Sequence, residues 1–135
     1  MPQKSSTIAL FNNGKVLLLK RGSSAPWQPN KYCLVGGGVD NGETLEDAAL
    51  REANEEIGIN LNKESLLPYT IVYNNTYTKI VFASLVTNIH IQLNYEHSEY
   101  GWFDYKSCVR MYKQKLLVPR LMKTLSTFHD SNILV

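Results

Sequence analysis

One segment of the chain, GGGVDNGETLEDAALREANEEIGI at residues 36–59, constrains the fold more than any other. Thr44 followed three residues later by Asp47 is typical of a helix N-cap, and Gly58 is typical of the residue that ends a helix. These signals predict a helix over Leu45–Ile57. Three glutamates gather in the second half of that helix, which is unusual for a chain whose formal net charge is +2.

The carboxylates Glu52, Glu55 and Glu56 lie where an ordinary surface helix would not place them. At about 100° per residue, Glu52 and Glu56 fall within the stripe of small residues that faces a core, and Glu55 lies beside it. The negative end of the helix dipole and the like charges one turn apart both disfavour this arrangement. A bound Mg²⁺ or Mn²⁺ would remove both penalties, because hard cations prefer carboxylate oxygens. The alternative is a solvated acidic face paired with lysine or arginine.

The remaining residues predict a mixture of strands and helices in one α/β domain over residues 1–135. Asn12-Asn13-Gly14 indicates a tight hairpin turn, and Asn74-Asn75 indicates a second turn. The glycines at 36–38 indicate a turn that brings backbone close to an anion or a metal. A last helix is expected from about Pro119. Strands are expected at 7–11, 15–20, 31–35, 69–73, 77–86, 90–93 and 100–105.

Composition excludes several classes of protein. The excess of 14 Lys and Arg over 12 Asp and Glu is too small to indicate a nucleic-acid partner. The chain has neither the apolar run of a signal peptide nor the roughly 20 apolar residues of a membrane span, so a cytoplasmic location is expected. Cys33 and Cys108 form no CxxC pair and are expected to be small buried hydrophobes.

The acidic segment resembles the signature of the Nudix hydrolase family, G-x5-E-x7-R-E-U-x-E-E-x-G-U, in which U is a bulky apolar residue. The resemblance covers 23 residues, from Gly37 to Ile59, with every fixed position at the correct spacing. The one soft departure is Ala53, which is smaller than the usual residue. The strand order on either side of the motif is also similar to that of the family. The residues that fill the fixed positions of the motif include Gly37, Glu43, Arg51, Glu52, Glu55, Glu56, Gly58 and Ile59.

The resemblance implies a fold, an activity and roles for these residues. The implied fold is an α/β/α sandwich around a mixed β-sheet, and the implied activity is hydrolysis of a nucleoside diphosphate linked to another group. Glu52, Glu55 and Glu56 would be metal ligands, with the carbonyl of Gly36 as a further ligand and with Glu52 and Glu55 acting directly in catalysis. Glu43, Arg51 and Gly58 would hold the motif together, and the backbone of Gly37 and Gly38 would contact substrate.

Residues 95–103 resemble a segment of MutT-like Nudix proteins in which an acid before the tryptophan-bearing strand binds metal or acts as general base. Glu96 is the first candidate for that role because of its distance ahead of Trp102, and Glu99 is the second. His97 is a third candidate, for positioning water or phosphate, although the sequence favours its being a solvent-exposed loop histidine. A basic residue that ends the second strand contacts substrate phosphate in similar proteins, and here Arg21 is favoured.

A second resemblance indicates the class of substrate. Residues 25–32 are similar to the segment before the motif in MutT-like nucleoside triphosphate pyrophosphohydrolases, so a nucleoside triphosphate is expected. Residues 116–120 contain no asparagine, which argues against specificity for oxidised guanine. A nucleotide-sugar hydrolase of the GDP-mannose type and an ADP-sugar pyrophosphatase remain as alternatives. A binding module without catalysis is disfavoured because every glutamate of the motif is present. The number of metal ions stays open, and a homodimer is possible.

Overall fold

The computed structural model describes residues 3–73 and 77–135, and the chain divides into two compact units. The first unit comprises residues 1–10 and 35–94, and the second comprises residues 11–34 and 95–135. Strand β1 (Gln3–Asn12) runs through both units, with its last two residues in the second. The predicted turn at Asn74-Asn75 lies outside the described residues, so it stays a prediction.

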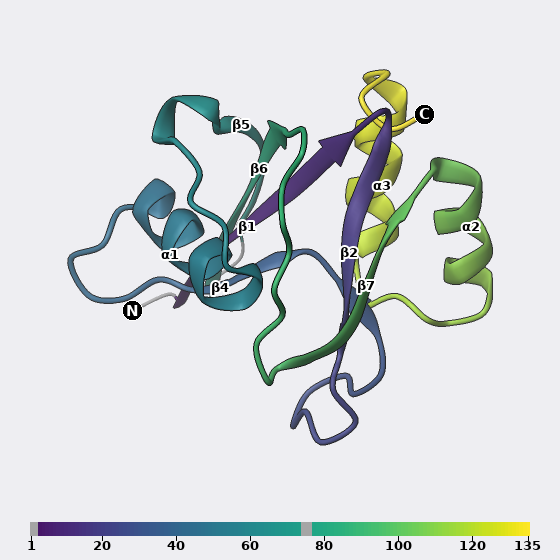
Figure 1. Ribbon diagram of the computed structural model, residues 1–135, viewed down its shortest axis with the longest axis horizontal. Coiled ribbons are helices and arrows are strands. Elements are labelled where there is room, and N and C mark those ends of the chain that lie inside the picture. Colours follow the sequence, from purple (N-terminus) through teal and green to yellow (C-terminus); the bar gives the residue numbers. More distant parts are fainter. Residues whose placement is uncertain (1–2, 74–76) are drawn as a thin grey trace. The chain divides into compact units, whose positions relative to one another are not determined.

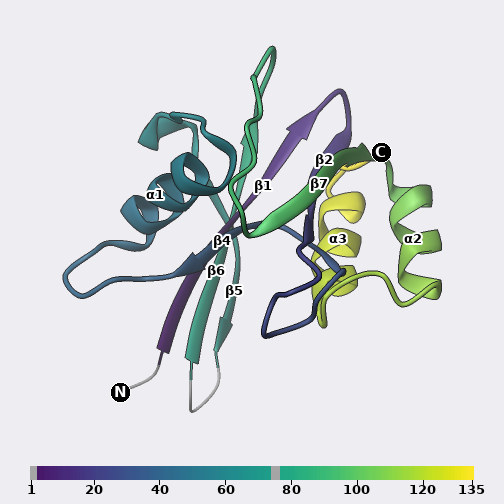
Figure 2. The same ribbon diagram turned by 60° about the horizontal axis from the view of Figure 1, so that its bottom comes forward.

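The first unit places one helix against a short strand of glycines. Helix α1 (Leu45–Ile57) lies beside β4 (Val35–Gly38), as Figure 1 shows. Strand β4 pairs antiparallel with β1, from Ser5 opposite Gly38 to Ile8 opposite Val35. A short 3₁₀ helix at Lys63–Ser65 leads into β5 (Leu67–Tyr73), which pairs antiparallel with β6 (Tyr77–Leu85) (Figure 2).

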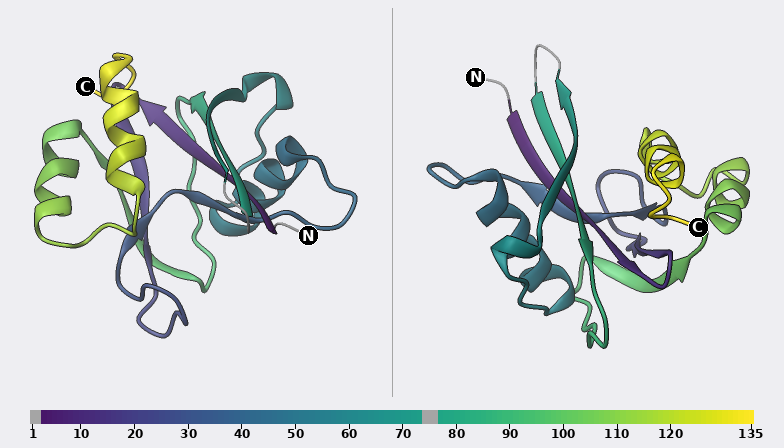
Figure 3. Two further views of the ribbon diagram at one scale, coloured as in Figure 1. Left: turned by 180° about the vertical axis from the view of Figure 1, so that it is seen from behind. Right: turned by 90° about the horizontal axis from the view of Figure 1, so that it is seen from above.

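The second unit is built around β2 (Lys15–Arg21), whose residues 16–19 are fully buried. On one edge β2 pairs with the end of β1 and with β3 (Tyr32–Cys33), and on the other it pairs with β7 (His97–Phe103). Helices α2 (Tyr105–Lys113) and α3 (Leu121–Asp130) lie side by side (Figure 3). The ring of Phe128 meets that of Phe11 edge-on at 5.0 Å, which joins α3 to β1.

Several sequence predictions are confirmed. Helix α1 begins and ends where the caps indicated. The hairpin turn between β1 and β2 uses Asn13 and Gly14, with φ angles of 53° and 75°. Both are left-handed, as a type I′ turn requires. Cys33 and Cys108 are buried and not joined in a disulfide, and burial raises the pKa of the Cys108 thiol to about 12.

The predicted strand at 90–93 is wrong, and its backbone explains why. The amide of Gln92 donates to the carbonyl of Ile57 at 2.9 Å, and the amide of Asn94 donates to the carbonyl of Glu56 at 3.1 Å. The last carbonyls of a helix have no partner within the helix. This segment therefore donates hydrogen bonds to the last carbonyls of α1 and does not join a sheet.

The chain between 97 and 113 also differs from prediction. Strand β7 begins at His97 and ends at Phe103, so Glu99 lies in a strand, opposite Lys20, and not in the loop. Helix α2 was not predicted, because its sequence is mostly polar and only Cys108 and Met111 are buried. A local signal was present, since the side chain of Asp104 accepts a hydrogen bond from the amide of Ser107 and caps the helix.

Two further predictions are corrected by the structure, the turn at the glycines 36–38 and the start of the last helix at Pro119. The glycines at 36–38 form strand β4 and not a turn. Helix α3 begins at Leu121, not at Pro119. The amide of Leu121 donates to the carbonyl of Val118 at 3.3 Å across a turn whose third residue, Arg120, has a φ of 70°. Pro119 is therefore the second residue of this turn, a position that proline favours.

Candidate active site

The candidate site begins with the ends of α1, which hold the helix in a defined register beside β4. The hydroxyl of Thr44 accepts a hydrogen bond from the amide of Asp47 at 3.0 Å. Gly58 has a φ of 71°, and its amide donates to the carbonyl of Asn54 at 3.0 Å. The hydroxyl of Ser6 on β1 donates to the carbonyl of Leu45 at 2.7 Å, which fastens the first turn of the helix to the strand.

The three glutamates differ in burial as the helical wheel predicts. Glu56 is 3% exposed, and its carboxylate accepts a hydrogen bond from the amide of Gly36 at 2.8 Å. The side chain of Glu52 is 13% exposed, whereas that of Glu55 is 52% exposed. A Cβ added to Gly37 would lie 2.7 Å from an oxygen of Glu52, so only glycine lets β4 approach this carboxylate so closely.

Arg51 connects the glutamates to the loop before the helix. Its guanidinium makes two hydrogen bonds to Glu43, at 2.9 and 3.1 Å, and a third to the carbonyl of Gly38 at 2.9 Å. It also donates to Glu52 at 3.0 Å and to Glu55 at 3.3 Å. Such a planar fork determines direction as well as charge. The expectation that Glu43 and Arg51 hold the loop on the helix agrees with this geometry.

The same contacts shift the proton affinity of both partners. The hydrogen bond from Arg51, together with one from the amide of Asp40, lowers the pKa of Glu43. The hydrogen bond to Glu43 is also the main cause that raises the pKa of Arg51, against the opposing effect of burial. Both groups therefore stay charged across the physiological pH range.

Carboxylate oxygens, the donor atoms of these glutamates, are the ligands that a hard divalent cation prefers. Glu52, Glu55 and Glu56 stand at positions i, i+3 and i+4 of one helix, so their carboxylates project from adjacent positions. A buried carboxylate such as Glu56 is costly unless charge or hydrogen bonds compensate it. Among the residues that the structure describes, no three acidic, histidine or cysteine side chains are arranged as a complete metal site. Arg51 and the amide of Gly36 hold the carboxylates instead.

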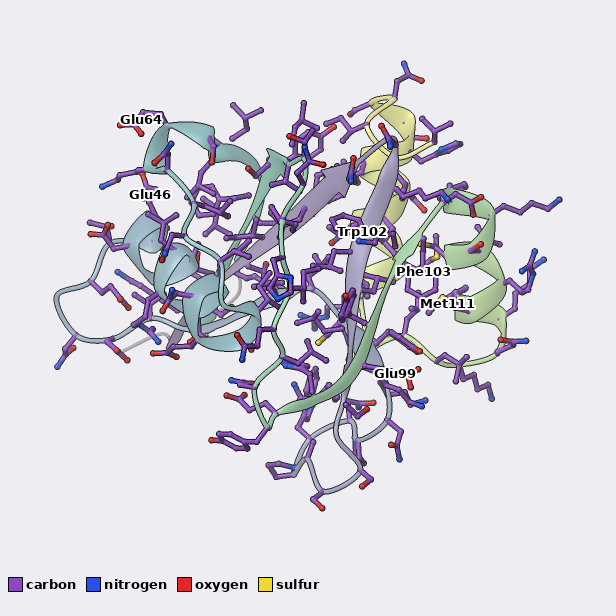
Figure 4. The ribbon with its side chains drawn as sticks, viewed as in Figure 1. Glu46, Glu64, Glu99, Trp102, Phe103 and Met111 are labelled. Carbon is purple, nitrogen blue, oxygen red and sulfur yellow. The ribbon has the colours of Figure 1, made fainter. Side chains whose placement is uncertain are left out.

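The remaining predicted residues belong to the second unit. Arg21 ends β2, opposite His97. Glu96 is exposed, and its carbonyl accepts a hydrogen bond from the amide of Gly22 at 3.0 Å. Figure 4 labels Glu99 toward the beginning of β7 and Trp102 toward its end. The prediction that these residues serve the same site as the glutamates of α1 stays a prediction.

His97 does not match the exposed loop residue that the sequence indicates. It is 6% exposed, and its Nε2 lies 3.7 Å from the sulfur of Cys33. Burial lowers the pKa of His97, and the charge of Arg21 acts in the same direction while that of Glu96 opposes it. The imidazole is therefore neutral at neutral pH.

Two residues with defined contacts here were missed by the sequence analysis. The hydroxyl of Tyr32 donates to Glu99 at 2.6 Å, and burial together with this carboxylate raises the pKa of Tyr32 to about 12. The ring of Trp27 lies under the guanidinium of Arg21, 5.2 Å from its carbon to the ring centroid. Neither pairing has a sequence signal, because Tyr32 and Glu99 are 67 residues apart and Trp27 lies in an irregular loop.

Comparisons with known proteins agree on one family. The NUDIX domain model matches residues 1–125. Nucleoside triphosphatase NudI from Escherichia coli O139:H28 is 30% identical, and the match covers 67% of this chain and 74% of that protein. The structure of the MutT protein from Methanosarcina mazei Go1 has a TM-score of 0.75 at 25% identity, covering 97% of this chain and 96% of that one.

A third similar structure is the bifunctional NMN adenylyltransferase/ADP ribose pyrophosphatase from Francisella tularensis, complexed with AMP and a Mn ion. Its TM-score is 0.78 at 16% identity, and the match covers 98% of this chain and 42% of that one. These likenesses confirm the predicted α/β sandwich around a mixed sheet. Because the family model spans the motif and most of the chain, and a curated relative is similar over two thirds of it, the chain belongs to the Nudix family of hydrolases, which act on phosphorus-containing acid anhydrides.

Proposed function

We propose that the chain is a Mg²⁺-dependent pyrophosphohydrolase that splits a nucleoside triphosphate into a nucleoside monophosphate and pyrophosphate. The observation that carries the proposal is the set of three carboxylates at adjacent positions of α1, of which Glu56 is buried, Glu52 is largely shielded from solvent and Glu55 is about half exposed. Its substrate class is supported by NudI, a nucleoside triphosphatase at 30% identity. We expect a cytoplasmic location, and no helix within the described residues is long and apolar enough to span a bilayer.

Nudix hydrolases use divalent metal ions, and the Francisella neighbour was solved with a Mn ion. Here the ligands would be Glu52, Glu55 and Glu56, with the carbonyl of Gly36. When bound, such an ion neutralises phosphate oxygens and lowers the pKa of a coordinated water. Mg²⁺ is favoured over softer metals because every proposed ligand atom is an oxygen, and Mn²⁺ is the natural substitute.

The residues around the carboxylates would orient them. Arg51 bonds Glu43, the carbonyl of Gly38 and two of the proposed ligands, so it controls where those ligands point. Phosphoryl transfer depends mainly on positioning and charge stabilisation. The close approach of Gly37 to Glu52 is consistent with backbone contacts to substrate at this strand, for which Gly37 and Gly38 are the candidates.

Glu96 is the proposed general base. Glu99 is less suited because its carboxylate already accepts a short hydrogen bond from Tyr32. His97 is less suited because it is buried beside Cys33. Glu96 is exposed at the end of the segment before β7, where its carboxylate can reach water. Arg21 is the proposed contact for substrate phosphate.

Product analysis tests the proposal. The purified protein with Mg²⁺ is expected to release a nucleoside monophosphate and pyrophosphate from a triphosphate, and Glu55→Gln should lower kcat by about two to three orders of magnitude. Glu46→Gln is the matched control, because Glu46 lies in the first turn of the same helix and not at a fixed position of the motif (Figure 4). Near-normal turnover by Glu55→Gln would reject the metal assignment.

The same experiment separates the alternative substrates. The protein should hydrolyse ADP-ribose and nucleotide sugars more slowly than the triphosphates. Two phosphate monoesters from ADP-ribose as the preferred reaction would redirect the substrate class. Release of free sugar with an intact nucleoside diphosphate would assign the chain to glycosyl hydrolysis.

A further inference from the structure

The loop at residues 22–31 follows β2 (Figure 1). Its last residues are hydrogen-bonded to Arg21, the residue that precedes the loop. The amide of Arg21 donates to the carbonyl of Lys31 at 2.8 Å, and the carbonyl of Arg21 accepts from the amide of Asn30 at 3.1 Å. Both ends of the loop therefore meet at the last residue of the strand. A compact loop with joined ends behaves as one structural unit.

The guanidinium of Arg21 is held by the middle of this loop. Its Nε donates to the carbonyl of Trp27 at 2.7 Å. Its carbon lies 5.2 Å from the centroid of the Trp27 ring, within the range of a cation–π interaction. One residue thus contacts Arg21 both through its backbone oxygen and through its aromatic face.

Arg21 forms no ion pair with an acidic side chain among the described residues. Among the described residues, no carboxylate lies within 4.0 Å of its guanidinium, whereas Arg51 contacts four acidic side chains. The Nε is occupied by Trp27, which leaves the two terminal NH₂ groups of a half-buried arginine for a ligand. Those two groups can bind a phosphate through parallel hydrogen bonds.

The loop maintains this arrangement in spite of unfavourable backbone angles. Gln28 and Asn30 both have left-handed φ angles, 49° and 62°, although neither is glycine. Such conformations persist where the surrounding contacts enforce them. Trp27 stands beside the first of them and is 52% exposed, so burial of its ring does not account for its presence.

We propose that Trp27 is a positioning residue, which holds the Arg21 guanidinium in the orientation that binds the anionic part of the substrate. The loop at 22–31 then determines substrate affinity and leaves the chemical step unaffected. This inference rests on the proposed function, because it assumes a substrate that carries phosphate. It assigns a role to an exposed aromatic residue that lies outside the Nudix motif.

Steady-state kinetics of four variants tests the inference. Trp27→Leu keeps an apolar side chain but removes the aromatic face, and it should raise KM for the triphosphate about three- to tenfold with little change in kcat. Trp27→Phe retains a ring and should restore most of the affinity. Arg21→Ala should raise KM about ten- to a hundredfold, as expected for loss of a charged hydrogen-bonding group. Tyr112→Ala, which removes another exposed aromatic residue at 56% exposure on α2, should leave KM unchanged.

The double variant Arg21→Ala/Trp27→Leu gives the sharpest result. If Trp27 acts through Arg21, the double variant should have the KM of Arg21→Ala within about twofold, because a residue that only positions another adds nothing once its partner is gone. Additive effects would show instead that Trp27 contacts substrate independently, which would overturn the proposal. A fall in kcat at constant KM in Trp27→Leu would also overturn it.

Failure of the inference and failure of the proposed function give different results. Absence of pyrophosphate release by the wild-type protein rejects the function before any variant is compared. If the wild-type protein is active but Trp27→Leu has the same KM as the wild type, only the role of Trp27 is rejected. Thermal unfolding of Trp27→Leu and Trp27→Phe should stay close to that of the wild type, because residue 27 is about half exposed and both variants keep an apolar side chain there.

Discussion

Replacing Arg51 by alanine should destabilise the protein, because this side chain joins the loop before α1 to the middle of the helix. In the folded state it makes five hydrogen bonds, two to Glu43 and one each to Glu52, Glu55 and the carbonyl of Gly38. The variant loses all five. It also leaves the carboxylate of Glu52, only 13% exposed, without the positive charge beside it.

The loss of unfolding free energy in Arg51→Ala lies between two limits. Exposed ion pairs contribute about 0–1 kcal/mol, whereas removing one partner of a buried pair costs about 3–5 kcal/mol. The side chain of Arg51 is 27% exposed, so solvent screens its contacts in part. We therefore expect Arg51→Ala to reduce the free energy of unfolding by about 1–3 kcal/mol. For a chain of this length that lowers the melting temperature by about 4–12 °C.

Thermal and urea unfolding followed by circular dichroism measure the effect. Arg51→Lys should fall between wild type and Arg51→Ala, because lysine keeps the charge but not the planar fork. The control is Lys63→Ala, whose ion pair with Asp47 is 3.7 Å long and about half exposed on both sides. That variant should lose about 0.5 kcal/mol or less. If Arg51→Ala is no less stable than Lys63→Ala, the contacts of Arg51 do not stabilise the fold.

Three further outcomes follow from the same geometry. Thr44→Ala should cost about 1 kcal/mol in urea unfolding by removing the N-cap of α1, and Thr44→Ser should cost little. The hydrogen bond from the amide of Ser107 lowers the pKa of Asp104, so its carboxylate stabilises the fold above its unfolded pKa of about 4 and this contribution is lost as pH falls through the folded pKa. Asp104→Asn should therefore melt below wild type at pH 7, and the two melting temperatures should converge in acid. Gly37→Ala should lower kcat for pyrophosphate release by about a hundredfold, because the added Cβ would lie 2.7 Å from an oxygen of Glu52 and displace this carboxylate.

The helix that carries the candidate site was predictable from sequence because its determinants are local. Thr44 and Gly58 act on their own neighbours in the chain, and the helical wheel needs only the order of residues to place Glu56 inward and Glu55 outward. The Nudix motif added the roles of these residues. Its spacing is preserved in the structure as contacts, since Glu43 and Arg51, eight positions apart, are bonded to each other.

Features that depend on distant partners were not predictable in this way. The segment at 90–93 has the composition of a strand, yet the amides of Gln92 within it and of Asn94 just after it donate to carbonyls at the end of α1. The hydrogen bond between Tyr32 and Glu99 makes Glu99 less suited as a general base, and it depends on two strands that pair with Lys20 from opposite sides. Pairing across a sheet follows from tertiary structure, which a single sequence does not encode in its local pattern.

The glycines at 36–38 were singled out correctly from the sequence, but the turn predicted for them is wrong. Three consecutive glycines favour a turn, but here they form a paired strand. A Cβ at Gly36 would collide with Ser6 and Thr7 of β1, and one at Gly37 would collide with Glu52 of α1. Side chains are therefore excluded at Gly36 and Gly37, because β1 approaches the first and α1 approaches the second. That approach is what brings the amide of Gly36 to the buried carboxylate of Glu56, so the glycines are required to place the carboxylates and not to reverse the chain.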